Sequence, residues 1–356
     1  MEILFHFVFA FIFMIIIIPL LSRLAVSTQL VDVPNSRKVH ATPTPLVGGL
    51  GIGLTLLLAF MLQPTIFTSI PAFYTVLSCA NVLLVMGVID DKKEIRPIYK
   101  LIIQIMCAYM VVRAGIKVDS LFGFMGIYDL PAWATDFFTV IIITGVVNAY
   151  NLIDGIDGLT GMMGILAFGV LLILTIYLEI YPMTCFLAAG AGSIVGFLKF
   201  NLGSRHKIFL GDAGSLFLGF LIVCQSIIIL QYSDGKGGVH QSLVLMILVA
   251  IMFVPVFDSI RVYIERWTKG KSPFTPERNH IHHLLQNMEL SPVKISIFLV
   301  MLSCLLLLLA LLVFRMSGIT VLMVLFIIIY KMITSLLKMN KSLNEWKNII
   351  KKLENH

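Results

Sequence analysis

The chain has 356 residues, of which 59% are hydrophobic and only 13% are charged, and its formal net charge is +7. A mean hydropathy of +0.98 excludes an ordinary soluble domain, because a soluble exterior needs far more solvated side chains. The five cysteines are scattered without a CxxC pair, which argues against a disulfide framework or a zinc site. No nucleic-acid-binding motif accompanies the positive charge, so nucleic acid is not an expected partner.

Eleven apolar runs are long enough to cross a bilayer, which requires about 20 residues per helix. We therefore predict an all-α, polytopic membrane protein with eleven transmembrane helices. The runs lie at residues 3–21, 46–63, 70–89, 98–113, 134–151, 159–178, 182–200, 209–231, 241–264, 293–314 and 317–335. The first run lacks the basic segment that precedes a signal peptide core, so we expect an uncleaved helix with its N-terminus outside. An odd number of spans then places the C-terminus inside.

The basic residues agree with this orientation. All but four of the 26 Lys and Arg residues fall on the predicted inner side, as the positive-inside rule requires. The exceptions are Arg113, Lys117, Lys236 and Arg315. Residues 1–335 are expected to form one transmembrane catalytic domain. Residues 336–356 are predicted to be a cytoplasmic, amphipathic, basic tail, with a plain solvated helix as the alternative.

Two segments outside the polar loops have a structural interpretation. Residues 114–133 contain Gly, aromatic and Pro residues that predict a small external hairpin. The GGLGIG run at 48–53 begins a predicted span rather than following a strand, so it does not indicate a nucleotide-binding loop. Its small residues predict close packing between helices.

Polar residues are concentrated in every second loop. Five segments stand out, at residues 32–45, 90–97, 148–158, 201–215 and 265–283. They follow predicted spans one, three, five, seven and nine, so all five face the same compartment. Solvated loops without a function would be distributed over both sides. The alternation predicts a single site at the inner membrane surface.

The second polar segment begins with Asp90 and Asp91 at the end of an apolar helix. Neighbours on a helix point about 100° apart, so one carboxylate is expected to face a ligand. The other is expected to orient it or to pair with Lys92 or Lys93. A charged helix end without a function is the alternative.

The third polar segment repeats an amide or a carboxylate every three residues, at Asn148, Asn151, Asp154 and Asp157. In an α-helix such a set fans around the axis, whereas in a 3₁₀ turn it lies on one face. Gly155 and Gly158 make a tightened or broken helix end plausible and allow a ligand to approach the backbone. Such polar groups at the edge of hydrocarbon are costly unless they bind something, which indicates a functional site.

The fourth polar segment places Asp212 in FLGDAGS, directly before a span. Ser215 would lie near the start of that helix, where free N–H groups favour phosphate. A simple N-cap by Asp212 is the alternative.

The fifth polar segment ends in a dense cluster, consisting of Arg278, Asn279, His280, His282 and His283. Three histidines in four positions raise the possibility of zinc, but the other segments offer oxygen ligands, which suit a hard cation. We interpret the histidines as donors to phosphate or sugar oxygens. Asp258 and Arg261, three residues apart, are interpreted as an internal ion pair outside the core site.

The carboxylates of these segments would repel one another unless a divalent cation neutralised them. They are Asp90, Asp91, Asp154, Asp157 and Asp212. Mg²⁺ commonly bridges a few carboxylates to phosphates, so a phosphorylated substrate is expected. A site open to both water and bilayer further suggests one soluble and one lipid substrate. The residues alone thus predict Mg²⁺-assisted phosphoryl chemistry between a soluble phosphate and a lipid.

Five motifs, in this order and spacing, resemble the polyprenyl-phosphate N-acetylhexosamine-1-phosphate transferases. They are VPNSRKVH, GVIDDKKEIRP, NAYNLIDGIDGL, IFLGDAGSLFLG and ERNHIHH. The resemblance implies a glycosyltransferase-type phosphotransferase that moves HexNAc-1-phosphate from a UDP-sugar to undecaprenyl phosphate and releases UMP. It also implies a Mg²⁺ cofactor, with Mn²⁺ left open.

The HIHH form is similar to the bacterial branch that uses UDP-GlcNAc. A first membrane step in wall teichoic acid synthesis is the role expected on this resemblance. Transfer of another UDP-HexNAc or of muramoyl-pentapeptide phosphate is the alternative. The resemblance places the protein in the bacterial plasma membrane with a cytoplasmic active site, and a homodimer is left open.

The resemblance also implies roles for single residues. Asp212 and Asn151 resemble the ligands of Mg²⁺ and of the diphosphate, and Asp157 resembles the residue near the uracil. Asp90 and Asp91 match the acidic pair on the lipid-phosphate or metal side, with Asp154 between the two groups, and these three are the catalytic candidates. The remaining candidates are substrate-binding, namely Lys38, His40, Asn148, Arg278, His280, His282 and His283.

Two mechanisms and two other protein classes remain open on the sequence. The lipid phosphate attacks the β-phosphorus in line, or an aspartate first forms a covalent intermediate. A secondary transporter would carry its ionisable residues near mid-span rather than at one end. A CDP-alcohol phosphotransferase would need an Ala-Arg pair that DGLTGM at 157–162 lacks.

Overall fold

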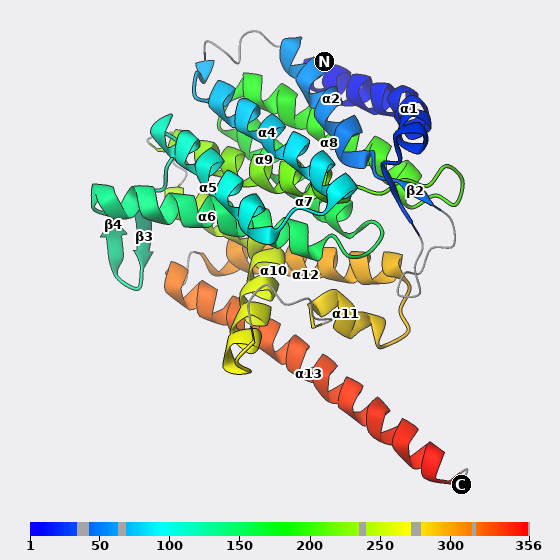
Figure 1. Ribbon diagram of the computed structural model, residues 1–356. Coiled ribbons are helices and arrows are strands. Elements are labelled where there is room, and N and C mark those ends of the chain that lie inside the picture. The colour runs from blue at the N-terminus through cyan, green and yellow to red at the C-terminus, as the bar shows by residue number, and fades with distance from the viewer. Residues whose placement is uncertain (34–42, 63–68, 235–239, 272–278, 315–317, 355–356) are drawn as a thin grey trace.

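The computed structural model describes the chain except for residues 34–42, 63–68, 235–239, 272–278, 315–317 and 355–356. The described residues form a helical bundle with two short two-stranded sheets (Figure 1). The prediction of an all-α membrane protein is confirmed.

Every predicted apolar run is occupied by a helix. The long helices are α1 (Glu2–Thr28), α2 (Gly48–Met61), α4 (Phe73–Lys93), α5 (Pro97–Arg113), α6 (Ala132–Ile153), α7 (Leu159–Tyr177), α8 (Tyr181–Asn201), α9 (Gly211–Tyr232), α10 (Gln241–Thr268), α12 (Pro292–Val313) and α13 (Ile319–Glu354). A short helix, α11 (Ile281–Gln286), lies between α10 and α12.

Nine helices within the described ranges are long and apolar enough to cross a membrane. Helix α2, with 14 residues, and α5, with 17, fall short of the length of about 20 that a bilayer requires. The integral membrane character is therefore established, whereas the count of eleven spans and the sidedness stay predictions.

Proline residues mark the beginning of several helices. Helices α5, α8 and α12 each have a proline in their first turn, at Pro97, Pro182 and Pro292. Proline suits this position because its ring fixes a helical φ and the first turn does not need its missing N–H. The prolines thus mark where these three helices begin.

Helix α9 lies at the centre of the bundle, and its whole apolar window is buried. It packs against α4, α6 and α2. The first turn of α9 is approached closely by glycines: a Cβ at Gly87 of α4 would collide with the backbone of Ala213, and one at Gly49 of α2 with that of Gly214. The interpretation of GGLGIG as a close-packing segment is confirmed. Consequently the end of α4 is held against the start of α9.

The outer helices expose apolar faces. Only 22% of the apolar window of α1 and 28% of that of α13 is buried, and Ile16, Met301 and Met332 are at least 60% exposed. In water such surfaces would aggregate, but in a bilayer they face lipid tails. The exposed side chains are therefore the lipid-facing surface of the protein.

The segment predicted as an external hairpin forms an antiparallel hairpin. Strand β3 (Ser120–Phe124) pairs with β4 (Ile127–Asp129), with Ser120 opposite Asp129 and Phe124 opposite Ile127. The backbone N–H of Met125 in its turn donates to Thr320 Oγ1 at the start of α13, at 2.8 Å. The hairpin is thereby fixed to the bundle (Figure 1).

A second small sheet lies at the opposite end of the bundle. Strand β1 (Val31–Asp32) pairs with β2 (Thr44–Pro45), and Leu46 forms a parallel bridge to Phe209. The bridge brings the loop after α1 to the loop before α9. The first and fourth polar segments therefore meet in space.

Helix α13 runs without interruption from its apolar span into the basic tail and ends at Glu354. Figure 1 shows its C-terminal part projecting away from the bundle. Residues 336–354 are thus helical, as predicted. Their separation as a cytoplasmic tail at a lipid surface stays a prediction.

Candidate active site

The five polar segments meet at one end of the bundle. Asp91 contacts the backbone of Asp212, Asp157 pairs with Lys207, and Gly155 lies against His282. The intervening loops meet at the other end, where Gln231 Nε2 donates to the carbonyl oxygens of Gly115 and Lys117 at 3.0 and 3.1 Å. The predicted alternation of loops is confirmed.

The carboxylate of Asp91 caps the start of α9. Its two oxygens accept hydrogen bonds from the backbone N–H groups of Asp212, at 2.8 Å, and Ala213, at 3.3 Å. Those N–H groups belong to the first helical turn and have no partner inside the helix. The capping role considered for Asp212 is therefore performed by Asp91 from α4, which leaves the Asp212 side chain available for other contacts.

Asp90 is buried and is held from two sides. Its Oδ1 accepts from the backbone N–H of Ile95 at 2.6 Å, and its Oδ2 is paired with Lys100 Nζ. The same ammonium group lies 3.0 Å from Asp212 Oδ2. The expectation that Lys92 or Lys93 pairs with this acidic pair is wrong, because Lys100, one turn into α5, reaches the carboxylates instead.

Lys100 is a site residue that the sequence reasoning missed. It bridges two carboxylates that are 122 positions apart in the chain, and its ammonium neutralises part of their negative charge. A usable signal existed: a lysine shortly after Pro97, in the first turn of a largely apolar helix, needs a polar partner.

Asn151 and Asp212 lie in one hydrogen-bonded group. Asn151 Nδ2 donates to Ser215 Oγ at 3.0 Å, and the Ser215 hydroxyl donates to the carbonyl oxygen of Asp212 at 3.3 Å. Because the Asn151 nitrogen is engaged, its Oδ1 is the atom that could serve as a ligand. The two residues predicted to bind metal are thus brought together through Ser215.

The donor set suits a hard cation that also binds substrate phosphate. Across the described residues, no three His, Cys, Asp or Glu side chains are grouped so that they could hold a metal ion alone. Mg²⁺ does not require such a cage, since it usually binds one or two carboxylates and completes its shell with water and phosphate. The carboxylate of Asp212, 35% exposed, and the amide oxygen of Asn151 fit that pattern.

Helix α6 ends directly before the DGIDG turn. The α-helix extends to Ile153, Asp154 is its C-cap, and Gly158 has a φ of 80°, which favours glycine. The helix therefore breaks, as anticipated, without the 3₁₀ alignment. Asn148 lies one turn before Asn151 and donates to Gln104 Oε1 at 2.7 Å, which ties α6 to α5.

The turn after α6 is held by three residues, two from the fourth polar segment and one from α12. Asn201 Oδ1 accepts from the Gly158 N–H at 2.7 Å, Lys207 Nζ lies 2.6 Å from Asp157 Oδ2, and Ser296 Oγ donates to the Asp157 carbonyl oxygen at 3.1 Å. Asp157 therefore presents a carboxylate already paired with a cation. Lys207 was not among the predicted site residues, although it lies in the fourth polar segment.

The surroundings of Asp154 disfavour the ionised form of its carboxyl group. Removal from water, followed by the negative charge of Asp212 and Asp91, raises the pKa of the Asp154 carboxyl to about 8. The raised pKa is therefore mainly a consequence of burial, to which the neighbouring carboxylates add. A bound divalent cation would offset the charge of those carboxylates.

The histidine cluster is placed by α11. His280 and His282 are buried, and their rings are nearly parallel, with ring centroids 5.7 Å apart. His283 Nδ1 lies 3.0 Å from Gln286 Oε1. Neither ring nitrogen of His282 has a hydrogen-bond partner among the described residues. Burial, together with the nearby rings of His283 and His280, lowers the pKa of His282 to about 3.

His282 lies directly against the turn after α6. A Cβ at Gly155 would be only 2.7 Å from His282 Nε2, so only glycine leaves room for the imidazole there. This contact connects the third and fifth polar segments. The buried, neutral imidazole without a partner is a group that a ligand oxygen could satisfy.

Asp258 has a wider role than the ion pair we predicted. The pair with Arg261 is present, with Arg261 Nη2 2.8 Å from Asp258 Oδ1. The same carboxylate also binds His280 Nδ1 at 2.7 Å and Tyr330 Oη at 2.7 Å. The predicted ion pair is therefore confirmed, and the same carboxylate also holds the first histidine of the cluster in place.

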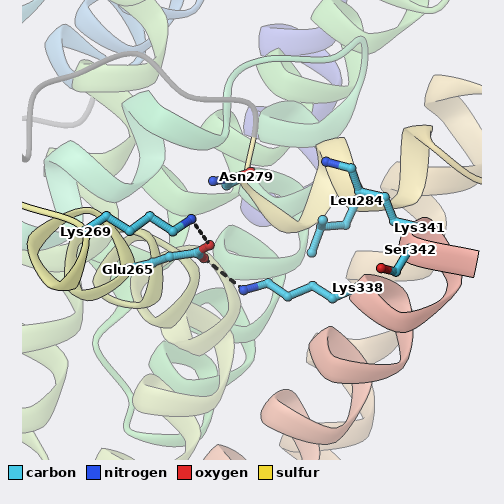
Figure 2. A pocket seen from close by; sticks show the side chains of 7 residues that line it. All are labelled: Glu265, Lys269, Asn279, Leu284, Lys338, Lys341 and Ser342. Atoms are coloured by element: carbon cyan, nitrogen blue, oxygen red, sulfur yellow. Dashed lines mark hydrogen bonds and ion pairs between the residues drawn. The ribbon is translucent and has the colours of Figure 1, made fainter. Parts of the chain in front are cut away.

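Three predicted substrate-binding residues, Lys38, His40 and Arg278, lie outside the described residues. Their roles stay predictions, as do the roles of the other predicted site residues. A shallow polar pocket of about 250 Å³ lies beside the histidine cluster (Figure 2). It is lined by Glu265, Lys269, Asn279, Leu284, Lys338, Lys341 and Ser342.

The fold and the site together define a class of protein. An apolar helical bundle whose paired carboxylates, lysines and histidines meet at the helix ends of one side is a membrane-embedded enzyme. A transporter would place its ionisable groups near mid-span.

The comparisons with known proteins give the family. The model for glycosyl transferase family 4 matches residues 73–230. An undecaprenyl-phosphate alpha-N-acetylglucosaminyl 1-phosphate transferase of Salmonella typhi is 30% identical over 280 residues, covering 77% of this chain and 74% of the relative. A Yersinia pestis protein of the same name is 29% identical over 283 residues, covering 78% and 75%. The chain belongs to this family of glycosyl transferases, as the motifs indicated.

Proposed function

We propose that the protein transfers N-acetylglucosamine-1-phosphate from UDP-GlcNAc to undecaprenyl phosphate and releases UMP. The observation that carries this proposal is the joining of the polar segments at one end of a membrane bundle, above all the contact of Asp91 with the start of α9. At that position a water-soluble nucleotide sugar and a lipid phosphate can meet. The names of the relatives support the same reaction.

The chemistry follows from the charges at the site. The lipid phosphate attacks the β-phosphorus of the diphosphate in line, and UMP leaves. Little base catalysis is required, because a phosphate monoester has a second pKa of about 6 and is mostly dianionic at neutral pH. Lys100 and Lys207 are positioned to steady phosphate oxygens, and Asp90 and Asp91 hold Lys100 and α9 in place.

Asp212 and Asn151 are the proposed ligands of Mg²⁺, with Mn²⁺ as the alternative ion. When bound, the ion would offset negative charge on the diphosphate and on the leaving UMP. The support for this assignment is the oxygen donor set and the link of both residues through Ser215.

The setting of the reaction is also a proposal. We place the protein in the bacterial plasma membrane with the site on the cytoplasmic side, because nearly all Lys and Arg residues lie on the side of the site. The product would be the lipid-linked first sugar of a cell-envelope polymer, for which wall teichoic acid remains the proposed example.

The deciding experiment measures UMP release by the purified protein from UDP-GlcNAc. The expected result is release that requires both undecaprenyl phosphate and Mg²⁺. UDP-GalNAc and UDP-muramoyl-pentapeptide are tested in parallel, and preference for either one would correct the sugar assignment. No lipid-dependent UMP from any UDP-sugar would refute the proposal.

A stereochemical measurement separates the two mechanisms. Single in-line displacement inverts the configuration at the β-phosphorus, whereas a covalent aspartyl intermediate gives net retention. We expect inversion, and retention would establish the covalent route.

A further inference from the structure

The start of the histidine cluster is held by one buried carboxylate in the second half of helix α10. Asp258 of α10 is fully buried. Its Oδ2 lies 2.7 Å from His280 Nδ1, and the backbone N–H of Ile281 donates to both of its oxygens at 3.1 and 3.2 Å. The side chain therefore binds both the first histidine and the first residue of α11.

Two further donors complete the environment of this carboxylate. Arg261 Nη2 and Tyr330 Oη both reach Asp258 Oδ1, at 2.8 and 2.7 Å, and Arg261 Nη2 also donates to the Asn279 carbonyl oxygen at 2.5 Å. A buried carboxylate is strongly unfavourable unless several donors surround it. The number of donors here shows a site built to keep Asp258 ionised and fixed.

Tyr330 brings the last transmembrane helix into this arrangement. It is fully buried on α13 and packs edge-to-face against Phe257 of α10, with ring centroids 5.2 Å apart. Further along α13, Lys338 Nζ lies 2.9 Å from Glu265, beside Asn279 of the histidine cluster and Leu284 of α11 (Figure 2). Helix α13 therefore contacts α11 in addition to facing lipid.

The contact with Asp258 decides which nitrogen of His280 is free. Because Nδ1 donates to the carboxylate, Nε2 is the nitrogen left for a substrate oxygen. The His280 ring also stacks on His282, whose Nε2 lies against Gly155. A displacement of Asp258 would consequently move the two parallel imidazoles, and with them the contact to the turn that carries Asp154 and Asp157.

We infer that Asp258 and Tyr330 are positioning residues, which fix the tautomer and orientation of His280 and make α13 part of the catalytic unit. The inference rests on the proposed function, since it assumes that the histidine cluster contacts substrate. It assigns no direct contact with substrate to either residue.

The first test removes a single hydroxyl group. Tyr330→Phe is expected to lower kcat/KM for UDP-GlcNAc by about tenfold, the size typical of losing a group that orients a ligand-binding histidine. Tyr232→Phe is the matched control, because it removes a tyrosine hydrogen bond, to the Ser69 carbonyl oxygen, at the opposite end of the bundle. The control is expected to retain the wild-type rate.

The second test separates positioning from general stability. Tyr330→Phe is combined with His280→Gln, which cannot make the Nδ1 contact. If Tyr330 acts through His280, the hydroxyl deletion has no further effect in that background. Asp258→Asn alone is expected to lower kcat/KM by about 10- to 100-fold, and combining it with His280→Gln adds little.

Each outcome is decisive. A Tyr330→Phe rate equal to that of the wild type, or an equal loss with and without His280→Gln, overturns the inference. Because the wild-type protein is assayed beside the variants, absence of UMP release in the wild type refutes the proposed function instead. The two failures are therefore distinguishable.

Discussion

The carboxylate cluster at the start of α9 and the histidine cluster at the start of α11 lie at the same end of the bundle but are held by different interactions. The first is fixed by backbone packing, since Gly87 lets α4 approach α9 until Asp91 reaches free N–H groups. The second is fixed by side chains around the buried Asp258. One half of the site therefore depends on helix spacing, whereas the other depends on a polar network that the loss of a single atom can perturb.

The largest effect is expected where the metal is proposed to bind. Asp212→Ala should lower UMP release by about 10³-fold or more, because a charge that stabilises the transition state is lost. Asp136→Ala is the control, since it removes an aspartate paired with Lys117 at the other end of the bundle. Full activity of Asp212→Ala would refute the metal assignment.

The second prediction disturbs the spacing between α4 and α9. Gly87→Ala places a methyl group against the backbone of Ala213, which cannot move aside without shifting α9. We expect a loss of about 1–3 kcal/mol in stability together with at least a tenfold loss of activity. Gly145→Ala in α6 is the matched control, because its added Cβ meets no atom within 4 Å. Thermal unfolding and UMP release measure the two effects, and a stable, active Gly87→Ala would contradict the packing argument.

The contact between the two clusters is tested at Gly155. Gly155→Ala pushes against His282 Nε2, 2.7 Å from the new Cβ, so the imidazole has to turn away. Activity is expected to fall by about tenfold, whereas the unfolding temperature should change little, because a side chain can yield where a backbone cannot. Gly169→Ala, whose Cβ would be unobstructed, is the comparison. Unchanged kinetics would show that the orientation of His282 does not matter.

The last prediction concerns stability rather than activity, and it is a dependence of stability on pH. The pKa of Asp154 is raised from 3.8 to about 8 in the folded protein, so the folded state binds more protons than the unfolded state between these values. Without a divalent cation, stability should therefore fall as the pH rises from about 4 to about 8. Asp154→Asn should flatten this dependence, and Mg²⁺ should restore stability at pH 8. An unfolding temperature that rises over this range in the wild type, relative to Asp154→Asn, would contradict the assignment.

Whether a feature could be predicted from the sequence depends on how far apart along the chain the interacting residues lie. The break of α6 before Asp154 could be predicted, because the Asp and Gly residues that cause it are neighbours. The partner of Asp90 could not: Lys92 and Lys93 are closer in sequence, but Lys100 of the next helix points at the carboxylate. Asp258 was assigned to its neighbour Arg261 alone, although His280 and Tyr330, 22 and 72 positions away, bind it as well.

The sequence by itself determined that this protein is a helical membrane bundle whose polar segments gather at one end. Apolar runs of this length satisfy their backbone hydrogen bonds as helices, and loops of alternating polarity gather most of the polar residues at one end of the bundle. The tertiary structure alone decided which charges pair, which histidine nitrogen is free and how α13 takes part. Those properties depend on how closely helices approach and how side chains fill the space between them, and that packing is set by the whole bundle rather than by any local pattern.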